Sequence, residues 1–282
     1  MSKESNNNRI NWYPGHMAKT MRLISAEIRN VEAVMEILDA RIPYSSQNPN
    51  LKKLANRKPR FIILNKADLA EAETTRKWIE YFSSKGNGVI AINSKKNSEA
   101  KALSSALDRF VAEKIRKKTD AKPRIMVVGI PNVGKSTIIN LLLGHNVAKV
   151  ENRPGVTRGK QWLSTEKYEL LDMPGVLWEK IDDQRCAYNL AYTGAIKDDV
   201  FDIEEVASSL LNELIDVSPA AVETYLSEII GERDGYALLE LIAQKRGYLF
   251  KGGIEDTEKA AKAVLTDLRN GKFGPVSLET PR

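Results

Sequence analysis

Cysteine is almost absent from this 282-residue chain, which contains only Cys186. A single thiol cannot form an internal disulfide, so a disulfide-stapled fold is excluded and a reducing compartment is favoured. Long apolar runs are also missing, since no stretch approaches the roughly 20 residues that a bilayer-spanning helix needs. The first ten residues, MSKESNNNRI, lack the apolar core of a secretory signal. We therefore expect residues 1–10 to be a flexible tail on a cytoplasmic protein without membrane attachment.

Acidic residues are scarce in the first two-thirds of the chain. Residues 1–200 contain 34 Lys and Arg against 22 Asp and Glu, a net of +12, whereas residues 201–282 contain 9 against 15, a net of −6. The basic surplus favours a polyanionic partner, because basic side chains displace condensed counterions from a phosphate backbone. A solvated basic surface explains the same charge equally well, so composition alone leaves both interpretations open.

Five apolar segments, each followed by a polar loop, predict the strands of one sheet. They are VEAVMEIL before DARIP, RFIIL before NKAD, GVIAI before NSKK, RIMVV before GIPNVGKST, and YELL before DMPG. Helical stretches such as EAETTRKWIEYFSS separate them, which predicts an α/β fold with a mostly parallel sheet covered on both faces. Ligands of such sheets bind beyond the carboxyl ends of the strands, so we expect the loops named here to converge.

The second part of the chain changes character. From about residue 185 the pattern is helical, as in EEVASSLLNELI, GYALLELIAQKRG and DTEKAAKAVLTDLRNG, and Asn270 and Gly271 are suited to ending the last helix. We therefore predict an α/β domain over residues 11–180 and an all-α domain over residues 181–282. The boundary between them is uncertain within residues 178–205.

The stretch GIPNVGKS, which begins at Gly129, matches the phosphate-binding pattern G-x-x-x-x-G-K-S between a strand and a helix. Backbone N–H groups of such a loop cradle phosphates, Lys135 reaches the β- and γ-phosphates and takes part in catalysis, and Ser136 supplies a hydroxyl to Mg²⁺. A coincidental loop is the alternative, which the strand–loop–helix context disfavours. The predicted nucleotide-binding residues here are Pro131, Asn132, Val133, Gly134, Lys135, Ser136 and Thr137.

The stretch NKAD predicts which base is bound. A buried Asp68 would accept hydrogen bonds from N1–H and the exocyclic amine of guanine, a pair that adenine does not present. Asn65 would brace the loop, and the stem of Lys66 would cover the face of the base. The alternative is that Asp68 caps a helix before LAEAE. Backbone N–H groups after the next strand would meet the guanine oxygen, so the predicted guanine site comprises Asn65, Lys66, Ala67, Asp68, Asn93 and Ser94.

Two weaker motifs complete a GTP site. DMPG follows YELL, so Asp172 is a predicted partner of Mg²⁺ and the N–H of Gly175 a predicted sensor of the γ-phosphate. RPGVT offers Thr157 as the hydroxyl that closes over Mg²⁺ and the γ-phosphate, which would make Thr157 a metal ligand and a catalytic residue. An ordinary loop threonine is the alternative for Thr157.

The order of these motifs is itself informative. In ordinary GTPases the phosphate-binding loop comes first and NKxD follows. Here NKAD and NSK precede GIPNVGKS, RPGVT and DMPG, which indicates a circular permutation of the P-loop GTPase fold. Together with WYPGHM, LDARIP, TGAIKD and a helical C-terminal region, this order closely resembles the bacterial ribosome biogenesis GTPase A family over nearly the whole chain. The resemblance implies a cytoplasmic GTPase, with GTP/GDP and Mg²⁺ as cofactors, that acts late in maturation of the large (50S) ribosomal subunit.

The resemblance also implies which molecules the protein binds. The expected partner is a precursor of the large subunit, with its rRNA and ribosomal proteins, and neither DNA nor a membrane is expected. The helical domain is likened to RNA-binding modules, and release from the particle would follow GTP hydrolysis. An RNA-binding scaffold in which the nucleotide is mainly a structural ligand is the alternative function.

A residue common in GTPases is missing. Many place a glutamine directly after D-x-x-G to orient the attacking water, and here that position is Val176. His16 could orient water or transfer a proton, although the sequence alone favours the alternative that it caps or packs the turn of Pro14 and Gly15. The resemblance implies catalysis, because His16 matches the proposed catalytic histidine of the family's PGHM motif. Slow hydrolysis without the particle is therefore expected.

Asn132 resembles the asparagine with which potassium-activated GTPases coordinate K⁺ beside the phosphates, and a loop-bracing asparagine is the alternative. We also expect RNA contacts from basic clusters at residues 52–60, 95–96 and 114–118. Helical phasing places Lys259, Lys262 and Arg269 on one face of the last helix and an apolar core face opposite. A solvated surface is the alternative for each cluster.

Overall fold

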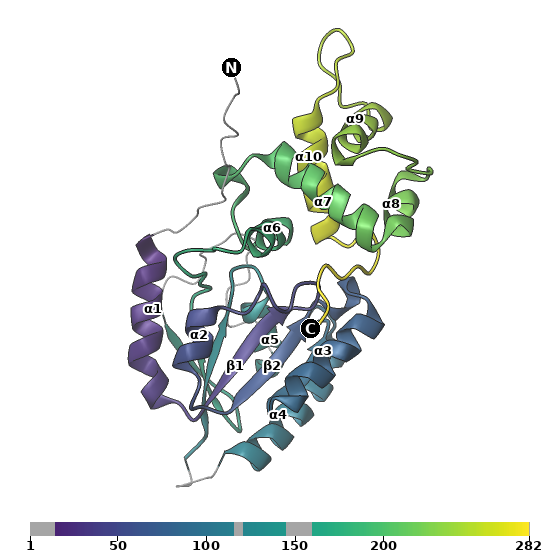
Figure 1. The fold of residues 1–282 in the computed structure, drawn as a ribbon. Coiled ribbons are helices and arrows are strands. Elements are labelled where there is room, and N and C mark those ends of the chain that lie inside the picture. The colour runs from purple at the N-terminus through teal and green to yellow at the C-terminus, as the bar shows by residue number, and fades with distance from the viewer. Residues whose placement is uncertain (1–14, 116–120, 145–159, 282) are drawn as a thin grey trace.

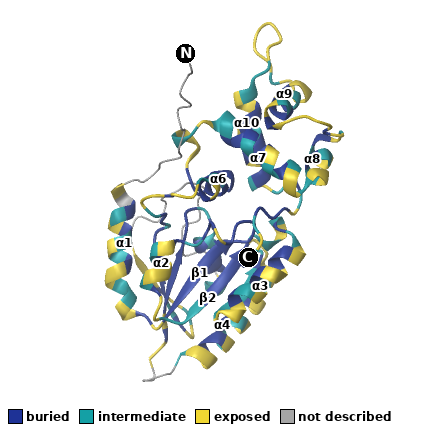
Figure 2. Cartoon of the chain, in the orientation of Figure 1, coloured by how far each residue is buried: buried dark blue, intermediate teal, exposed yellow. Residues whose placement is uncertain are grey.

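The computed structural model describes residues 15–115, 121–144 and 160–281, apart from the side chain of His16 (Figure 1). In this part of the chain, no helix is long and apolar enough to cross a membrane. Burial is concentrated in the sheet and in the inner faces of the helices, whereas the outer faces of α3 (Ala72–Ser84) and α4 (Ala100–Lys114) are exposed (Figure 2).

A six-stranded sheet in the order β3-β2-β1-β4-β6-β5 forms the first part of the fold. All neighbours pair in parallel except β5, which is antiparallel to β6. The predicted mostly parallel α/β sheet is confirmed, while β5 was not predicted because QWLS is short and mostly exposed. The strands are β1 (Ala33–Asp39), β2 (Arg60–Asn65), β3 (Gly88–Ile92), β4 (Arg124–Gly129), β5 (Gln161–Ser164) and β6 (Glu169–Asp172).

Side-chain alternation along β2 shows how helices cover both faces of the sheet. Phe61 joins the larger core, where its ring lies 5.2 Å from that of Phe110 on α4. Ile62 and Leu64 face the other way and pack with Trp78 of α3 in a separate cluster. The helices of this part are α1 (Gly15–Glu27), α2 (Pro49–Leu54), α3 (Ala72–Ser84), α4 (Ala100–Lys114) and α5 (Lys135–Leu143).

The rest of the fold is mainly helical, as the sequence predicts, with an isolated antiparallel bridge between Leu249 and Glu255. Aspartates cap four of them, for example Asp202, whose carboxylate accepts hydrogen bonds from the N–H groups of Glu204 and Glu205. Figure 1 shows α6 between the sheet and the other helices. The division into domains at residue 181 stays a prediction. The helices are α6 (Gln184–Tyr192), α7 (Ile203–Val217), α8 (Pro219–Leu226), α9 (Gly235–Lys245) and α10 (Thr257–Arg269).

One expectation for α10 is wrong. Its core face is buried as predicted, but Arg269 is not part of a free basic face. Its guanidinium donates hydrogen bonds to the carbonyl oxygens of Ala191 and Tyr192 and pairs with Asp198 at 2.7 Å. Helical phasing predicts which side of the helix a residue occupies, but not what packs against that side. Here α6 packs against the side of α10 that contains Arg269.

After α10, the C-terminal segment (residues 273–281) returns to the carboxyl edge of the sheet. The N–H of Val276 donates to the carbonyl of Leu69 and the N–H of Leu278 to that of Arg41, both at 3.0 Å. Trp78 donates its indole N–H to the carbonyl of Glu279. The last residues are therefore attached to the loops that follow β1 and β2, close to NKAD.

Candidate functional site

Asn65, the last residue of β2, joins three of the predicted motifs. Its amide nitrogen donates to the carbonyl of Val133 at 2.8 Å, and its amide oxygen accepts from the N–H of Ser94 at 3.2 Å. Asn65 is buried, so both hydrogen bonds are shielded from water. The structure thus brings NKAD, the NSK loop and GIPNVGKS together, although Asn65 and Val133 are 68 residues apart in sequence.

The glycine at position 134 is required for two reasons. Its φ of +101° lies in the left-handed region that favours glycine. A Cβ atom there would also lie 2.2 Å from the amide nitrogen of Asn65. The same residue therefore shapes the phosphate-binding loop and lets it approach the guanine-site loop.

Lys135 begins α5, directly after Gly134, which provides no side-chain cap for the first N–H groups of this helix. Such N–H groups are suited to anions. The ammonium of Lys135 is buried and donates to the carbonyl of Ile130 at 3.0 Å. Burial lowers the pKa of Lys135 to about 8, with the charge of Asp172 opposing this effect. An anion such as phosphate would favour the charged lysine.

Asp172, the last residue of β6, fits the role of a metal ligand. Its carboxyl group is 2% exposed, and no described residue donates a hydrogen bond to its Oδ1 atom. Burial raises the pKa of Asp172 to about 6, against the opposing charge of Lys135. Carboxylate and hydroxyl oxygens suit Mg²⁺, which takes one or two protein ligands and otherwise phosphates and water. Asp172 and the partly buried Ser136, in the first turn of α5, would supply such oxygens.

Gly175 lies directly against the phosphate-binding loop. A Cβ atom on Gly175 would lie 2.8 Å from the ammonium of Lys135 and 2.9 Å from backbone atoms of Pro131. Only a glycine allows this approach, which brings the backbone of DMPG to the place where a γ-phosphate sensor is expected. Thr137 lies in α5 beside Ser136 and is also partly buried.

Val176 is fully buried and cannot hold a water molecule. Its N–H donates to the carbonyl of Gly129 at 3.3 Å, and its carbonyl accepts from the side chain of Asn48 at 3.1 Å. The sequence did not predict this role of Asn48, because the pattern QNPN indicates only that Asn48 caps a helix. It fixes the backbone that follows DMPG.

At the guanine end the structure differs from one expectation. Asp68 lies in a short 3₁₀ turn (Ala67–Leu69) and is exposed, so the expected buried carboxylate is not formed by the chain alone. No hydrogen bond links its carboxylate to another described residue. The side chain of Asn93 instead accepts from the N–H of Lys95 at 3.0 Å. A bound base would therefore have to provide both the burial and the hydrogen-bond donors for Asp68.

Asn132 connects the phosphate-binding loop with the helical region. It adopts a left-handed φ of +57°, which asparagine tolerates better than most residues. Its amide nitrogen donates to the carbonyl of Gly194, in TGAIKD, at 2.7 Å. Two predicted residues cannot be placed in this way, since Thr157 and the side chain of His16 lie outside the described residues.

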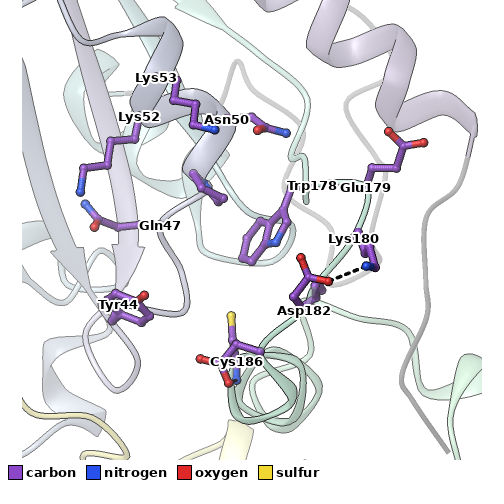
Figure 3. A pocket seen from close by; sticks show the side chains of 13 residues that line it. Tyr44, Gln47, Asn50, Lys52, Lys53, Trp178, Glu179, Lys180, Asp182 and Cys186 are labelled. Carbon is purple, nitrogen blue, oxygen red and sulfur yellow. Dashed lines mark hydrogen bonds and ion pairs between the residues drawn. The ribbon is translucent and has the colours of Figure 1, made fainter.

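A cavity of about 490 Å³ lies beside the segment that follows DMPG (Figure 3). One wall is formed by Trp178 and the residues up to Cys186, and the other by Tyr44 and the start of α2. Burial raises the pKa of the Cys186 thiol to about 12, so the thiol stays protonated and unreactive. Lys180 pairs with Asp182 across 2.9 Å at the rim.

Comparisons with known proteins show which proteins this chain resembles. The family model described as "50S ribosome-binding GTPase" matches residues 124–229. The chain is 42% identical to ribosome biogenesis GTPase A of Bacillus cereus over 280 residues, which cover 96% of this chain and 94% of that protein. It is 31% identical to the GNP-bound YlqF structure from T. maritima, with a TM-score of 0.72 over 94% of this chain and 99% of that one. A GDP-bound YlqF structure matches at 31% identity, with a TM-score of 0.71 over 92% and 99%.

We predict that Asn65→Ala separates the three motifs. The carbonyl of Val133 and the N–H of Ser94 would lose their buried partner, at a cost of about 1–3 kcal/mol each. Affinity for GDP should fall by about ten- to a hundredfold in isothermal titration calorimetry. Asn87→Ala is the control, because Asn87 also donates to a carbonyl, that of Phe82, but at the far end of α3. Equal affinities in the two variants would contradict the role of Asn65.

We predict that Asp172→Asn stabilises the nucleotide-free protein at pH 7.5. Since the folded-state pKa of Asp172 is raised from 3.8 to about 6, stability from this group falls as pH rises from about 4 to 6 and stays low above. The variant should gain about 1–3 kcal/mol at pH 7.5 and nothing near pH 4, measured by thermal unfolding. It should also lose stabilisation by Mg²⁺ with GDP. Asp182→Asn, at an exposed position, is the control. A lower melting temperature of Asp172→Asn at pH 7.5 would contradict the claim that burial of the ionised Asp172 destabilises the free protein.

Proposed function

The chain belongs to the ribosome biogenesis GTPase A family, and from this premise we propose that it is a GTP-hydrolysing assembly factor for the large (50S) ribosomal subunit. The observation that carries the proposal is the contact of NKAD, NSK and the phosphate-binding loop through Asn65, with Asp172 buried beside Lys135. These groups together suit a guanine base at one end and a polyphosphate with its metal ion at the other. The homologues' name supports a ribosomal partner, and the cytoplasm is the proposed location.

Each described group has a part in the proposed reaction. Lys135 and the first N–H groups of α5 hold the β- and γ-phosphates, and the N–H of Gly175 contacts the γ-phosphate. Ser136 and Asp172 hold Mg²⁺, with Thr157 as the proposed third protein ligand. When bound, this ion would supply positive charge that offsets the negative charge developing on the transferred phosphate. The residues of NKAD orient the base and so align the γ-phosphate with the attacking water.

The attacking water needs a further residue, because Val176 is apolar and buried. We assign this part to His16, the second residue of α1. A ribosomal particle would have to fix its segment, WYPGHM, in position. An arginine finger contributes about 10³ to 10⁵ in rate, so a site without a finger or an orienting glutamine should hydrolyse GTP slowly in the absence of the particle. Hydrolysis on the particle would then release the factor from a nearly mature large subunit.

The helical region is the proposed reader of nucleotide state. The backbone after DMPG passes along the cavity of Figure 3 and leads into α6 rather than back into the sheet. Loss of a γ-phosphate releases such segments in GTPases. Nucleotide state would therefore reposition α6 and the helices attached to it, which together with the basic first part of the chain contact rRNA.

The buried charges at the site favour a second candidate function. Lys135 and Asp172 are both buried at a cost that phosphate and Mg²⁺ would remove, so a nucleotide would stabilise the fold even without turnover. The chain would then be an RNA-binding scaffold with the nucleotide as a structural ligand. Turnover on the particle distinguishes the two functions.

The deciding experiment is sedimentation of the protein with large-subunit precursors. We predict salt-sensitive association with a non-hydrolysable GTP analogue and much weaker association with GDP. The particle should raise the GTPase rate by at least about a hundredfold, and His16→Ala should abolish this rise while association is retained. Lys135→Ala, which cannot hold the phosphates, is the control for nucleotide dependence. Equal hydrolysis with and without the particle would favour the scaffold.

We further predict that K⁺ accelerates hydrolysis through Asn132. The hydrogen bond to Gly194 fixes the amide nitrogen, which leaves the amide oxygen of Asn132 for a cation. Asn132→Gly keeps the left-handed φ without strain but removes that oxygen. The ratio of the rates in KCl and NaCl should be at least about tenfold for the unaltered chain and close to one for the variant. Equal ratios in both proteins would show that Asn132 only braces the loop.

A further inference from the structure

Three charged side chains form a compact group at the end of β1. Asp39 is fully buried and accepts two hydrogen bonds from the guanidinium of Arg41, at 2.9 and 2.8 Å. Its Oδ2 atom also accepts from the ammonium of Lys66 at 2.9 Å. The register of the sheet explains this meeting, because Asp39 pairs with Asn65, the residue before Lys66.

The charges in this group hold Asp39 ionised. Burial alone would raise the pKa of Asp39, but Arg41 and Lys66 outweigh it and hold the pKa below its usual range. Burial lowers the pKa of Lys66, and the carboxylate of Asp39 opposes this effect. One buried anion therefore faces two cations, of which only Lys66 belongs to a motif that meets the base.

Asp39 is the only described residue with a hydrogen bond from the side chain of Lys66. Its backbone has a left-handed φ of +60°, a conformation that non-glycine residues adopt rarely. A lysine stem has four rotatable bonds, and an untethered ammonium would move freely in water. The hydrogen bond to Asp39 removes this freedom at the tip of the side chain, so both ends of the lysine stem are fixed.

We propose that Asp39 is the positioning residue for Lys66, and that it holds the lysine stem against the face of the guanine base. Arg41 fixes the carboxylate by two hydrogen bonds and is itself held by the carbonyl of Leu268, at the end of α10, at 3.1 Å. The stem is thereby ordered before the nucleotide arrives, so binding does not have to order it. This inference rests on the proposed guanine site.

A double-mutant cycle tests the inference. The four full-length proteins are the unaltered chain, Asp39→Asn, Lys66→Met and the double variant, and the dissociation constant of GDP is measured for each by calorimetry. Lys66→Met keeps an apolar stem but has no ammonium for Asp39 to hold. We expect Asp39→Asn to weaken binding at least about tenfold in the unaltered background and less than about twofold in the Lys66→Met background.

A matched control separates positioning from stability. Glu36, also on β1, is a buried carboxylate that pairs with Arg60 of β2, away from the carboxyl edge of the sheet. Glu36→Gln removes this buried ion pair and should change GDP affinity by less than about twofold, whatever its effect on the melting temperature. If Asp39→Asn fails to fold because Arg41 is left unpaired, the neutral pair D39N/R41Q replaces it in the same cycle.

Each outcome is decisive. A Lys66-dependent loss overturns a merely structural role for Asp39, whereas equal losses in both Lys66 backgrounds, or no loss, overturn the positioning role. If the unaltered chain does not bind GDP, the proposed function fails and this inference with it. If the unaltered chain binds and the cycle shows no coupling, only this inference fails.

Discussion

The site depends on the buried amide of Asn65. This one side chain fixes the spacing between the loop that would read the base and the loop that would hold the phosphates, because it donates to Val133 and accepts from Ser94. Both bonds lie at the carboxyl edge of the sheet, where parallel strands bring loops from distant parts of the sequence together. Circular permutation changes the order in which these loops are made, but not their positions at that edge. The amide therefore does the same task whichever loop comes first in the chain.

Buried charge is the cost of this arrangement. Lys135 and Asp172 have pKa values of about 8 and about 6, displaced from their ordinary values in the directions that burial dictates, and Oδ1 of Asp172 has no hydrogen-bond donor among the described residues. A core optimised only for stability would not contain such a pair. Phosphate and a divalent cation would supply the missing opposite charges, so the cost of burying Lys135 and Asp172 in the free protein would be recovered when they bind. The contrast with Asp39 is informative, because Arg41 and Lys66 already satisfy that carboxylate without a ligand.

The sequence predicted the parts of the fold that depend on local pattern. Apolar runs marked five of the six strands, and glycine spacing marked the phosphate-binding loop, because strand burial and left-handed turns leave direct traces in residue type. What the sequence did not predict depends on long-range partners. Asn48, the Arg41 contact with Leu268 and the return of residues 273–281 to Leu69 involve residues up to 227 positions apart. The sequence predicted Arg269 as a surface cation because it gives no sign that α6 packs against that side of α10. Asp68 is exposed in the chain alone, because its burial would require a bound base.

The end of α10 is connected to both ends of the proposed nucleotide site, through Arg41 at one end and Gly194 at the other. The carbonyl of Leu268 holds Arg41, and through it the carboxylate that contacts Lys66 at the guanine end. The next residue, Arg269, binds the last carbonyls of α6 and lies against Gly194, whose own carbonyl holds Asn132 at the phosphate end. A rigid helix cannot shift by even an ångström without changing hydrogen bonds of about 3 Å on both sides. Movement of the helical region and the geometry of the nucleotide site are therefore physically linked at Leu268 and Arg269, in addition to the backbone connection that follows DMPG.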